Sequence, residues 1–146
     1  MRVKGGMGPP RFDKEVPVQY MLLDYVREEG WTALTKVEQV TWLGAYKAYL
    51  EAMAEAGVLK HSLGLHPTAS ATTLRTVEGD LQVLDGPYAD SKEQLGGFHL
   101  IEAPDLDAAI AWAARCPTVR HGVVEVRPVM NVDLATLIQQ IQGSDT

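Results

Sequence analysis

The chain has 146 residues, 46% of them hydrophobic and 22% charged, which is the composition of one globular domain and excludes a largely disordered chain. Its formal net charge of −6, with no cluster of Lys and Arg, excludes the basic footprint that nucleic-acid binding requires. Its single cysteine, Cys116, excludes an internal disulfide, and no apolar run reaches the roughly 18 residues of a membrane span, so we expect a cytoplasmic protein.

The first elements are predicted to be an arm, a strand and a long helix. Residues 1–17 contain three Gly and three Pro, which indicates a flexible N-terminal arm. The apolar run 18–26 is typical of a strand. Thr35 and Glu38 have the spacing of a capping box, so a helix is expected from about Lys36 to Ala56, ended by Gly57.

The rest of the chain is predicted to alternate strands and helices. Asp105 is the expected N-cap of a second helix, which Pro117 ends after Cys116. Asp133 begins a short amphipathic helix that runs to Gln142. The remaining predicted elements are strands at 58–65, 72–77, 80–85, 97–102 and 122–129, the second and third of them forming a hairpin around Gly79.

Two strand–helix–strand units, separated by the hairpin, predict an α+β fold. Their order is that of a ferredoxin-like βαβ-hairpin-βαβ sandwich, with an antiparallel sheet and both helices on one face. The other sheet face then needs a partner or a ligand. We therefore expect an arm at 1–17, a domain at 18–130 and a tail with a short helix at 131–146.

The long helix carries two apolar stripes, which indicates burial on two sides. Val40, Leu43, Leu50 and Ala54 form one stripe, and Trp42, Tyr46, Tyr49 and Met53 form the other. The aromatic stripe either packs under the arm or the C-terminal helix, or forms a contact in a homodimer. This stripe and the uncovered sheet face together predict a homodimer.

Asp85 is the main candidate for a catalytic residue. An Asp in a turn usually accepts the backbone N–H two residues further on, but that residue is Pro87, which has none. The carboxylate must then bond to the N–H of Tyr88, to a side chain, to water or to a ligand. Gly86 permits a backbone conformation that presents Asp85 to a pocket, and Tyr88 is a candidate substrate contact.

Further candidates lie around this loop. Glu93 is either the N3 residue of a helical turn capped by Asp90 or a second carboxylate that raises the pKa of its neighbour. His66 is the candidate catalytic partner of Asp85, with a solvated loop histidine as the alternative. No pair of His or Cys residues has metal-ligand spacing, so no metal site is expected.

Two arginines could bind an anionic substrate. Arg127 shares a strand face with Glu125, so an ion pair within the chain or across a dimer is the alternative. Arg75 lies on the predicted hairpin. Cys116 has no activating base nearby in sequence and is interpreted as structural. No phosphate-binding loop or serine nucleophile elbow is present.

Four motifs in order resemble a known family. They are YMLL at 20–23, ATTLR at 71–75, DGPYADSKEQLGGF at 85–98 and VEVRPV at 124–129. This pattern resembles the YciI-like superfamily and its DGPF branch over roughly residues 19–129. Tyr88 stands where that signature usually has Phe, and His99 where Tyr or Phe is common.

The resemblance implies a ferredoxin-like protomer of the dimeric α+β barrel class. Relatives in that class include cofactor-free monooxygenases, muconolactone isomerases and dehalogenating enzymes, and some YciI-like proteins use a His–Asp pair. The first hypothesis is therefore a cofactor-independent enzyme that acts on a small organic acid or ring compound near Asp85. The second is a non-catalytic ligand sensor or partner-binding protein associated with an extracytoplasmic-function sigma factor. Both remain open.

Overall fold

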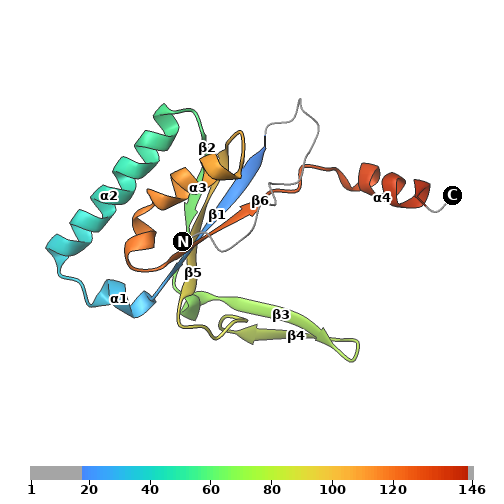
Figure 1. The fold of residues 1–146 in the computed structure, drawn as a ribbon. Coiled ribbons are helices and arrows are strands. Elements are labelled where there is room, and N and C mark those ends of the chain that lie inside the picture. The colour runs from blue at the N-terminus through green and yellow to red at the C-terminus, as the bar shows by residue number, and fades with distance from the viewer. Residues whose placement is uncertain (1–17, 145–146) are drawn as a thin grey trace.

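The computed structural model describes residues 18–144, which form one four-stranded sheet, one two-stranded hairpin and helices (Figure 1). The sheet has the order β2-β5-β1-β6, and every neighbouring pair is antiparallel. Its strands are β1 (Gln19–Val26), β2 (Leu59–Gly64), β5 (Gln94–Glu102) and β6 (Val123–Pro128). The hairpin strands are β3 (Thr72–Val77) and β4 (Asp80–Asp85).

The helices are α1 (Glu28–Thr32), α2 (Lys36–Glu55), α3 (Leu106–Ala114) and α4 (Leu134–Gly143), with 3-10 turns η1 (Thr68–Ser70) and η2 (Pro117–Arg120). The units β1-α2-β2 and β5-α3-β6 interleave in the sheet, and α2 and α3 cover the same face. This arrangement confirms the predicted ferredoxin-like fold with β3 and β4 inserted between the units.

The predicted helix caps are confirmed. The Thr35 hydroxyl accepts the Glu38 N–H at 3.1 Å, and the Glu38 carboxylate accepts the Thr35 N–H at 3.0 Å. Gly57 follows the helix with φ +75°, a conformation that glycine adopts without a steric penalty. Asp105 and Asp133 cap α3 and α4 by accepting the Ala108 and Thr136 N–H groups, each at 2.8 Å.

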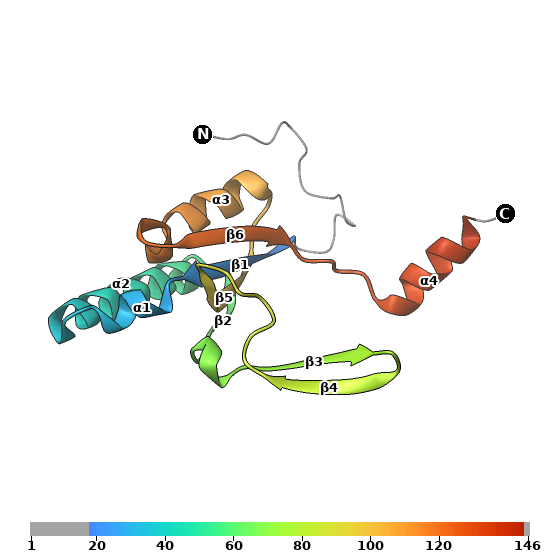
Figure 2. The same cartoon turned by 90° about the horizontal axis from the view of Figure 1, so that it is seen from below.

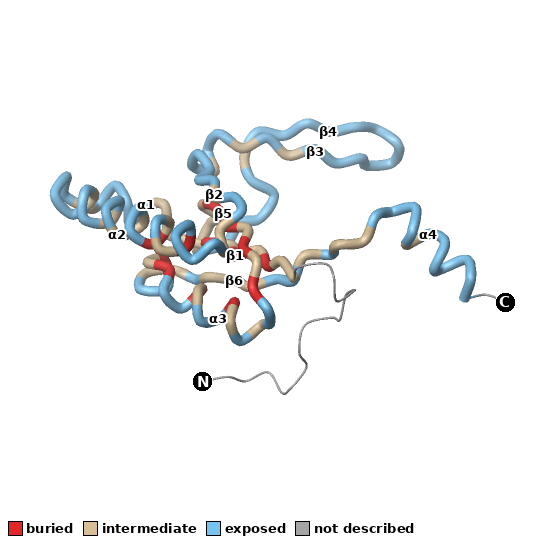
Figure 3. The backbone as a smooth tube through the Cα atoms, turned by 90° about the horizontal axis from the view of Figure 1, so that it is seen from above, coloured by how far each residue is buried: buried red, intermediate tan, exposed pale blue. Residues whose placement is uncertain are grey.

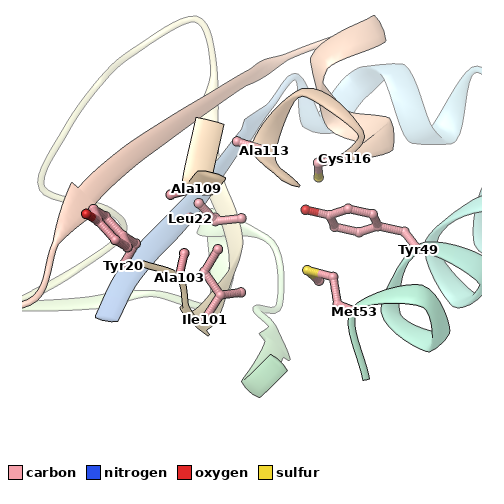
Figure 4. Close-up of a cluster of buried hydrophobic side chains, with 9 residues drawn as sticks. All are labelled: Tyr20, Leu22, Tyr49, Met53, Ile101, Ala103, Ala109, Ala113 and Cys116. Atoms are coloured by element: carbon pink, nitrogen blue, oxygen red, sulfur yellow. The ribbon is translucent and has the colours of Figure 1, made fainter. Parts of the chain in front are cut away.

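The core lies between the sheet and the two helices that cover it. Figure 4 shows Tyr49 and Met53 reaching from α2 towards Leu22 and Ile101 of the sheet. The Tyr49 hydroxyl donates to the Trp112 carbonyl of α3 at 2.8 Å, so one buried side chain joins the two helices. The buried hydrophobic residues are Tyr20, Leu22, Tyr49, Met53, Ile101, Ala103, Ala109, Ala113 and Cys116.

The aromatic stripe of α2 faces the sheet, which corrects the expectation that it packs under a terminal segment or against a second chain. Tyr49 and Met53 are buried in the core, whereas Val40 and Leu43 of the other stripe are 70% and 58% exposed. The Tyr49 ring meets the His99 ring of β5 edge to face, with the ring centroids 5.7 Å apart. The prediction of a homodimer therefore keeps only the uncovered sheet face as its support.

The hairpin and α4 extend away from the body of the domain (Figure 2). Every residue of β4 is exposed, and α4 has no buried residue (Figure 3). Leu74, Leu81 and Val83 of the hairpin are 59%, 64% and 60% exposed. Both segments thus present apolar side chains that the described chain does not cover.

Two local predictions are wrong, the helical turn at 90–93 and the start of the fifth strand at Gly97. Residues 90–93 form no helical turn, and the Gln94 side chain donates to the Ser91 carbonyl at 2.7 Å. The chain enters β5 at Gln94, three residues earlier than predicted. Glu93 pairs instead with Arg27, at 3.8 Å from Oε1 to Nε.

The predicted arm at 1–17 lies outside the described residues. None of the helices within residues 18–144 is long and apolar enough to cross a membrane.

Candidate functional site

Three polar side chains from three strands converge under the helices. In β5, His99 lies directly opposite Ser62 of β2 and Leu22 of β1. Asp24 lies two residues after Leu22, on the same sheet face, and is opposite Gly97. Asp24 and His99 are only 7% and 5% exposed. Buried groups of this polarity need partners, and here the strand register supplies them.

The three side chains form one hydrogen-bonded chain. His99 Nε2 lies 2.9 Å from Asp24 Oδ2, and His99 Nδ1 lies 2.9 Å from the Ser62 hydroxyl oxygen. An ionised carboxylate can only accept hydrogen bonds, so an ionised Asp24 requires the ring proton of His99 to be on Nε2. Nδ1 is then bare and accepts the proton of Ser62. The imidazole is thereby oriented with its basic nitrogen towards the serine.

Cys116 is a second partner of Asp24. Its thiol donates to Asp24 Oδ1 at 3.6 Å. Burial, with a further contribution from Asp24, raises the pKa of the Cys116 thiol to about 11. The thiol therefore keeps its proton at neutral pH and acts as a donor, which agrees with its structural interpretation.

Asp24, His99 and Cys116 also make up a possible set of metal ligands. One donor atom from each lies within 4.8 Å of the others. Carboxylate, imidazole and thiolate are ligands that zinc accepts, but the thiol would have to lose a proton that burial retains. The three residues are 24, 99 and 116 in the chain, so sequence spacing alone could not indicate this set.

The hydrogen-bonded chain opens onto a cavity of about 820 Å³. The cavity lies between the sheet, α2 and the α1 segment, and Asp24, Ser62 and His99 all line it. Most of its remaining wall is apolar. The apolar lining residues are Val26, Trp31, Trp42, Leu43, Leu50, Leu63, Leu65 and Pro67. A cavity of this size and character fits a small organic molecule.

Aromatic rings form one side of the cavity. Trp42 stacks on His121 with ring centroids 3.5 Å apart, and Trp31 lies 6.4 Å from Trp42. Burial lowers the pKa of His121, so this ring is neutral at pH 7 and stacks as an uncharged aromatic. The Tyr46 hydroxyl lies 2.5 Å from the Thr118 hydroxyl, and burial raises the pKa of Tyr46 to about 12.

Acidic side chains outnumber basic ones around the cavity. Besides Asp24, it is lined by Glu28 and Glu29, with Arg27 as the one Arg or Lys in the described lining. Arg27 is paired with Glu93, and Glu28 accepts the N–H and the hydroxyl of Thr68 at 2.7 and 2.9 Å. The surplus of carboxylates disfavours an anionic ligand.

The residues predicted as a site lie elsewhere on the molecule. His66 is exposed in the turn between β2 and η1, next to Leu65 and Pro67 of the cavity wall. Arg75 is exposed on the hairpin opposite Gln82. Tyr88 is 80% exposed, and Arg127 lies on β6 opposite Met21. None of the predicted residues is among the described residues that line the cavity.

Asp85 ends β4, opposite Thr72, and is exposed. Gly86 has φ +102°, which confirms that the turn uses a conformation favouring glycine. The turn is closed by the Gly86 N–H to the Ala71 carbonyl and by the Thr73 hydroxyl to the Gly86 carbonyl, each at 2.8 Å. A catalytic role for Asp85 stays a prediction.

Sequence reasoning missed Asp24, His99 and Ser62, although two of them carry a signal. Asp24 is in phase with Tyr20 and Leu22, and His99 is in phase with Ile101, so each is a polar residue on the buried side of an apolar strand. A polar residue at such a position indicates a buried partner. Ser62 has no comparable signal, because only the register with β5 gives it a neighbour.

Comparisons with known proteins agree with this architecture. The family model described as YCII-related domain matches residues 18–133. An uncharacterized protein of Rhizobium meliloti (strain 1021) is 38% identical over 112 residues, which is 75% of this chain and 90% of that relative.

Proposed function

Since the chain belongs to the YCII-related family, whose domain spans residues 18–133, we propose that it is an enzyme whose cavity carries out acid–base chemistry on a small ring compound. The observation that carries this proposal is the buried pair of His99 and Asp24, joined at 2.9 Å and open to an apolar cavity.

The pair has the features of a general base. Asp24 fixes the orientation and tautomer of His99, so the unprotonated Nδ1 lies against the hydroxyl of Ser62, a residue of the cavity lining. A ring nitrogen that accepts a hydrogen bond can also take up a proton and return it in each catalytic cycle. The carboxylate also stabilises the imidazolium that exists between these two steps.

The cavity wall narrows the class of substrate. Rings of Trp31 and Trp42 offer flat apolar surfaces, and the carboxylates of Glu28 and Glu29 lie nearby. Aromatic walls favour planar, apolar molecules, while the surplus negative charge selects against organic acids. A neutral ring compound fits both properties.

The experiment first searches for a compound that the protein converts and then measures the same conversion in two variants. A library of neutral ring compounds is incubated with the protein, binding is followed by tryptophan fluorescence, and products are detected by mass spectrometry. His99→Gln is expected to retain binding and to lose conversion by at least about 100-fold, the usual contribution of a general base. His66→Gln is the matched control, because His66 is an exposed histidine outside the cavity. Equal activity of His99→Gln and wild type would refute the proposal.

We also propose that the chain functions as a homodimer. The sheet face opposite the helices carries the half-exposed side chains of Met21, Leu23, Phe98 and Leu100. A sheet face with these residues is stable in water when a second sheet covers it. Light scattering at micromolar concentration should give the mass of two chains, and Leu23→Lys should give the mass of one. A wild-type monomer would contradict the proposal.

Association with a sigma factor remains the alternative function. The observation that favours it is the exposed apolar surface of the hairpin, at Leu74, Leu81 and Val83. A pull-down with wild-type protein and with a Leu81→Lys variant would test it. Loss of a captured sigma factor in the variant would support the alternative, and capture by neither protein would remove it.

A further inference from the structure

Ser62 occupies a position that the acid–base proposal does not explain. It lies on β2, directly opposite His99, and its side chain lines the cavity. Both neighbouring residues of this edge strand, His61 and Leu63, are exposed, whereas Ser62 is partly buried on the inner face. Its hydroxyl is thus the last group of a chain that begins at the buried carboxylate of Asp24 and reaches the cavity.

We propose that Ser62 is a nucleophile and that the reaction of this site is acyl transfer from a neutral ester to Ser62, followed by hydrolysis. This inference rests on the proposed function of the cavity and names its reaction. The geometry that carries it is the row of two hydrogen bonds, 2.9 Å from Ser62 to His99 Nδ1 and 2.9 Å from His99 Nε2 to Asp24.

The order of donors and acceptors activates the serine. A hydroxyl is a weak nucleophile until a base removes its proton during the attack. Cys116 and His99 both donate to Asp24, so the carboxylate is held as an acceptor and keeps the imidazole proton on Nε2. Nδ1 is then the base for Ser62. A serine, a base and an orienting carboxylate within hydrogen-bond reach are recognised by such roles and not by their order in a chain.

The reaction proceeds in two balanced steps. In acylation, the Ser62 oxygen bonds to the ester carbonyl carbon, its proton moves to His99 Nδ1, the bond to the alcohol oxygen breaks, and that oxygen leaves with the proton from Nδ1. In deacylation, water bonds to the acyl carbon, its proton moves to Nδ1, and the Ser62 oxygen leaves and recovers that proton. The sum is an ester and water converted to a carboxylic acid and an alcohol.

The same cavity defines the ester. Its apolar wall and the stacked pair of Trp42 and His121 suit an aryl or other ring group, and its carboxylates disfavour an anionic one. The acid formed by hydrolysis carries a negative charge, which the carboxylates of Asp24 and Glu28 repel. Product release is therefore favoured by the charges that select a neutral substrate.

The test uses p-nitrophenyl acetate and a fluorophosphonate probe with the full-length protein. We expect ester hydrolysis, a covalent adduct on the peptide that contains Ser62, and loss of both by at least about 100-fold in Ser62→Ala. Ser91→Ala is the matched control, because Ser91 is an exposed serine whose hydroxyl bonds only locally to the Glu93 carbonyl. Unchanged hydrolysis in Ser62→Ala, or an adduct only at other residues, would overturn the inference.

The failure of this inference is distinguishable from that of the proposed function. If His99→Gln abolishes conversion of a library compound and Ser62→Ala does not, the general-base role of His99 is supported and the nucleophilic role of Ser62 is refuted. If neither variant changes conversion, both roles are refuted. Elemental analysis adds a third outcome: one zinc ion per chain that is lost in Cys116→Ala would make His99 and Asp24 ligands, and would overturn the role of Ser62.

Discussion

Replacement of Asp24 by Asn should separate the chemistry of the site from its stability. Asn has the same shape as Asp, and its amide oxygen can still accept the Cys116 thiol that lies 3.6 Å from Oδ1. Its amide nitrogen then takes the position of Oδ2, 2.9 Å from His99 Nε2, and donates where the carboxylate accepted. His99 must answer by moving its proton to Nδ1, which then donates to Ser62.

The number of hydrogen bonds is unchanged, but their direction is reversed. Since a bond to a charged acceptor is replaced by a neutral one, the free energy of unfolding should fall by only about 1 kcal/mol. The serine loses its base, so acylation of Ser62 should fall by about 100- to 10,000-fold. Asp24→Ala instead leaves the buried Nε2–H unpaired and should cost about 1–3 kcal/mol for that donor alone.

Two measurements check these expectations. Urea denaturation gives the free energy of unfolding for wild type, Asp24→Asn and Asp24→Ala. Nitrogen-15 NMR of the His99 ring reports which nitrogen carries the proton. Equal destabilisation by the two variants, or an unchanged tautomer in Asp24→Asn, would refute the assignment of donors and acceptors.

Three further outcomes follow from contacts in the domain. Within residues 18–144 the buried Tyr20 hydroxyl has no hydrogen-bond partner, so Tyr20→Phe should leave the free energy of unfolding unchanged or raise it. Tyr49→Phe loses the bond to the Trp112 carbonyl and should lower that free energy by about 1 kcal/mol, which urea denaturation of both variants will measure. In Gly97→Ala the new Cβ would lie 2.7 Å from the Leu63 carbonyl oxygen, so β2 should shift away from His99. The free energy of unfolding should fall by about 1–3 kcal/mol, and the fluorophosphonate probe should no longer label Ser62. Gly64→Ala is the control, because a Cβ at that position meets no atom within 4 Å. Burial lowers the pKa of His121, so as the pH falls the unfolded chain takes up a proton at this ring before the folded chain does. The free energy of unfolding should therefore fall as the pH drops below about 6.5. His121→Gln should remove that part of the decline, and an identical pH profile in the variant would exclude this cause.

The fold could be predicted from local chemistry, because each element has its own signal. The capping box at Thr35 and Glu38 and the glycine at position 57 bound α2 within a residue of its observed ends. The YciI-like resemblance agrees with the family model, while its DGPF branch stays a prediction. The turn at 90–93 was predicted wrongly because the strand pairing of Gln94 outweighs a local capping pattern.

The site could be predicted only in part, since it depends on register between distant strands. Asp24 and His99 are 75 positions apart, and Ser62 and His99 are 37 apart. Alternation shows that Asp24 and His99 face inward, but no local rule states which residues of β1, β2 and β5 lie opposite one another. Asp85, by contrast, has a signal within three residues of sequence, because Pro87 lacks the N–H that an Asp in a turn usually accepts.

The hairpin of β3 and β4 lies apart from the core that holds Asp24, Ser62 and His99 in place. It leaves the sheet after β2 and returns before β5, yet β4 buries no residue in the described chain and β3 buries none fully. Substitutions along its 72–85 segment are therefore free of the packing constraints that hold the core. The surface of the hairpin can therefore change, residue by residue, while the strand register that brings Asp24, Ser62 and His99 together is preserved.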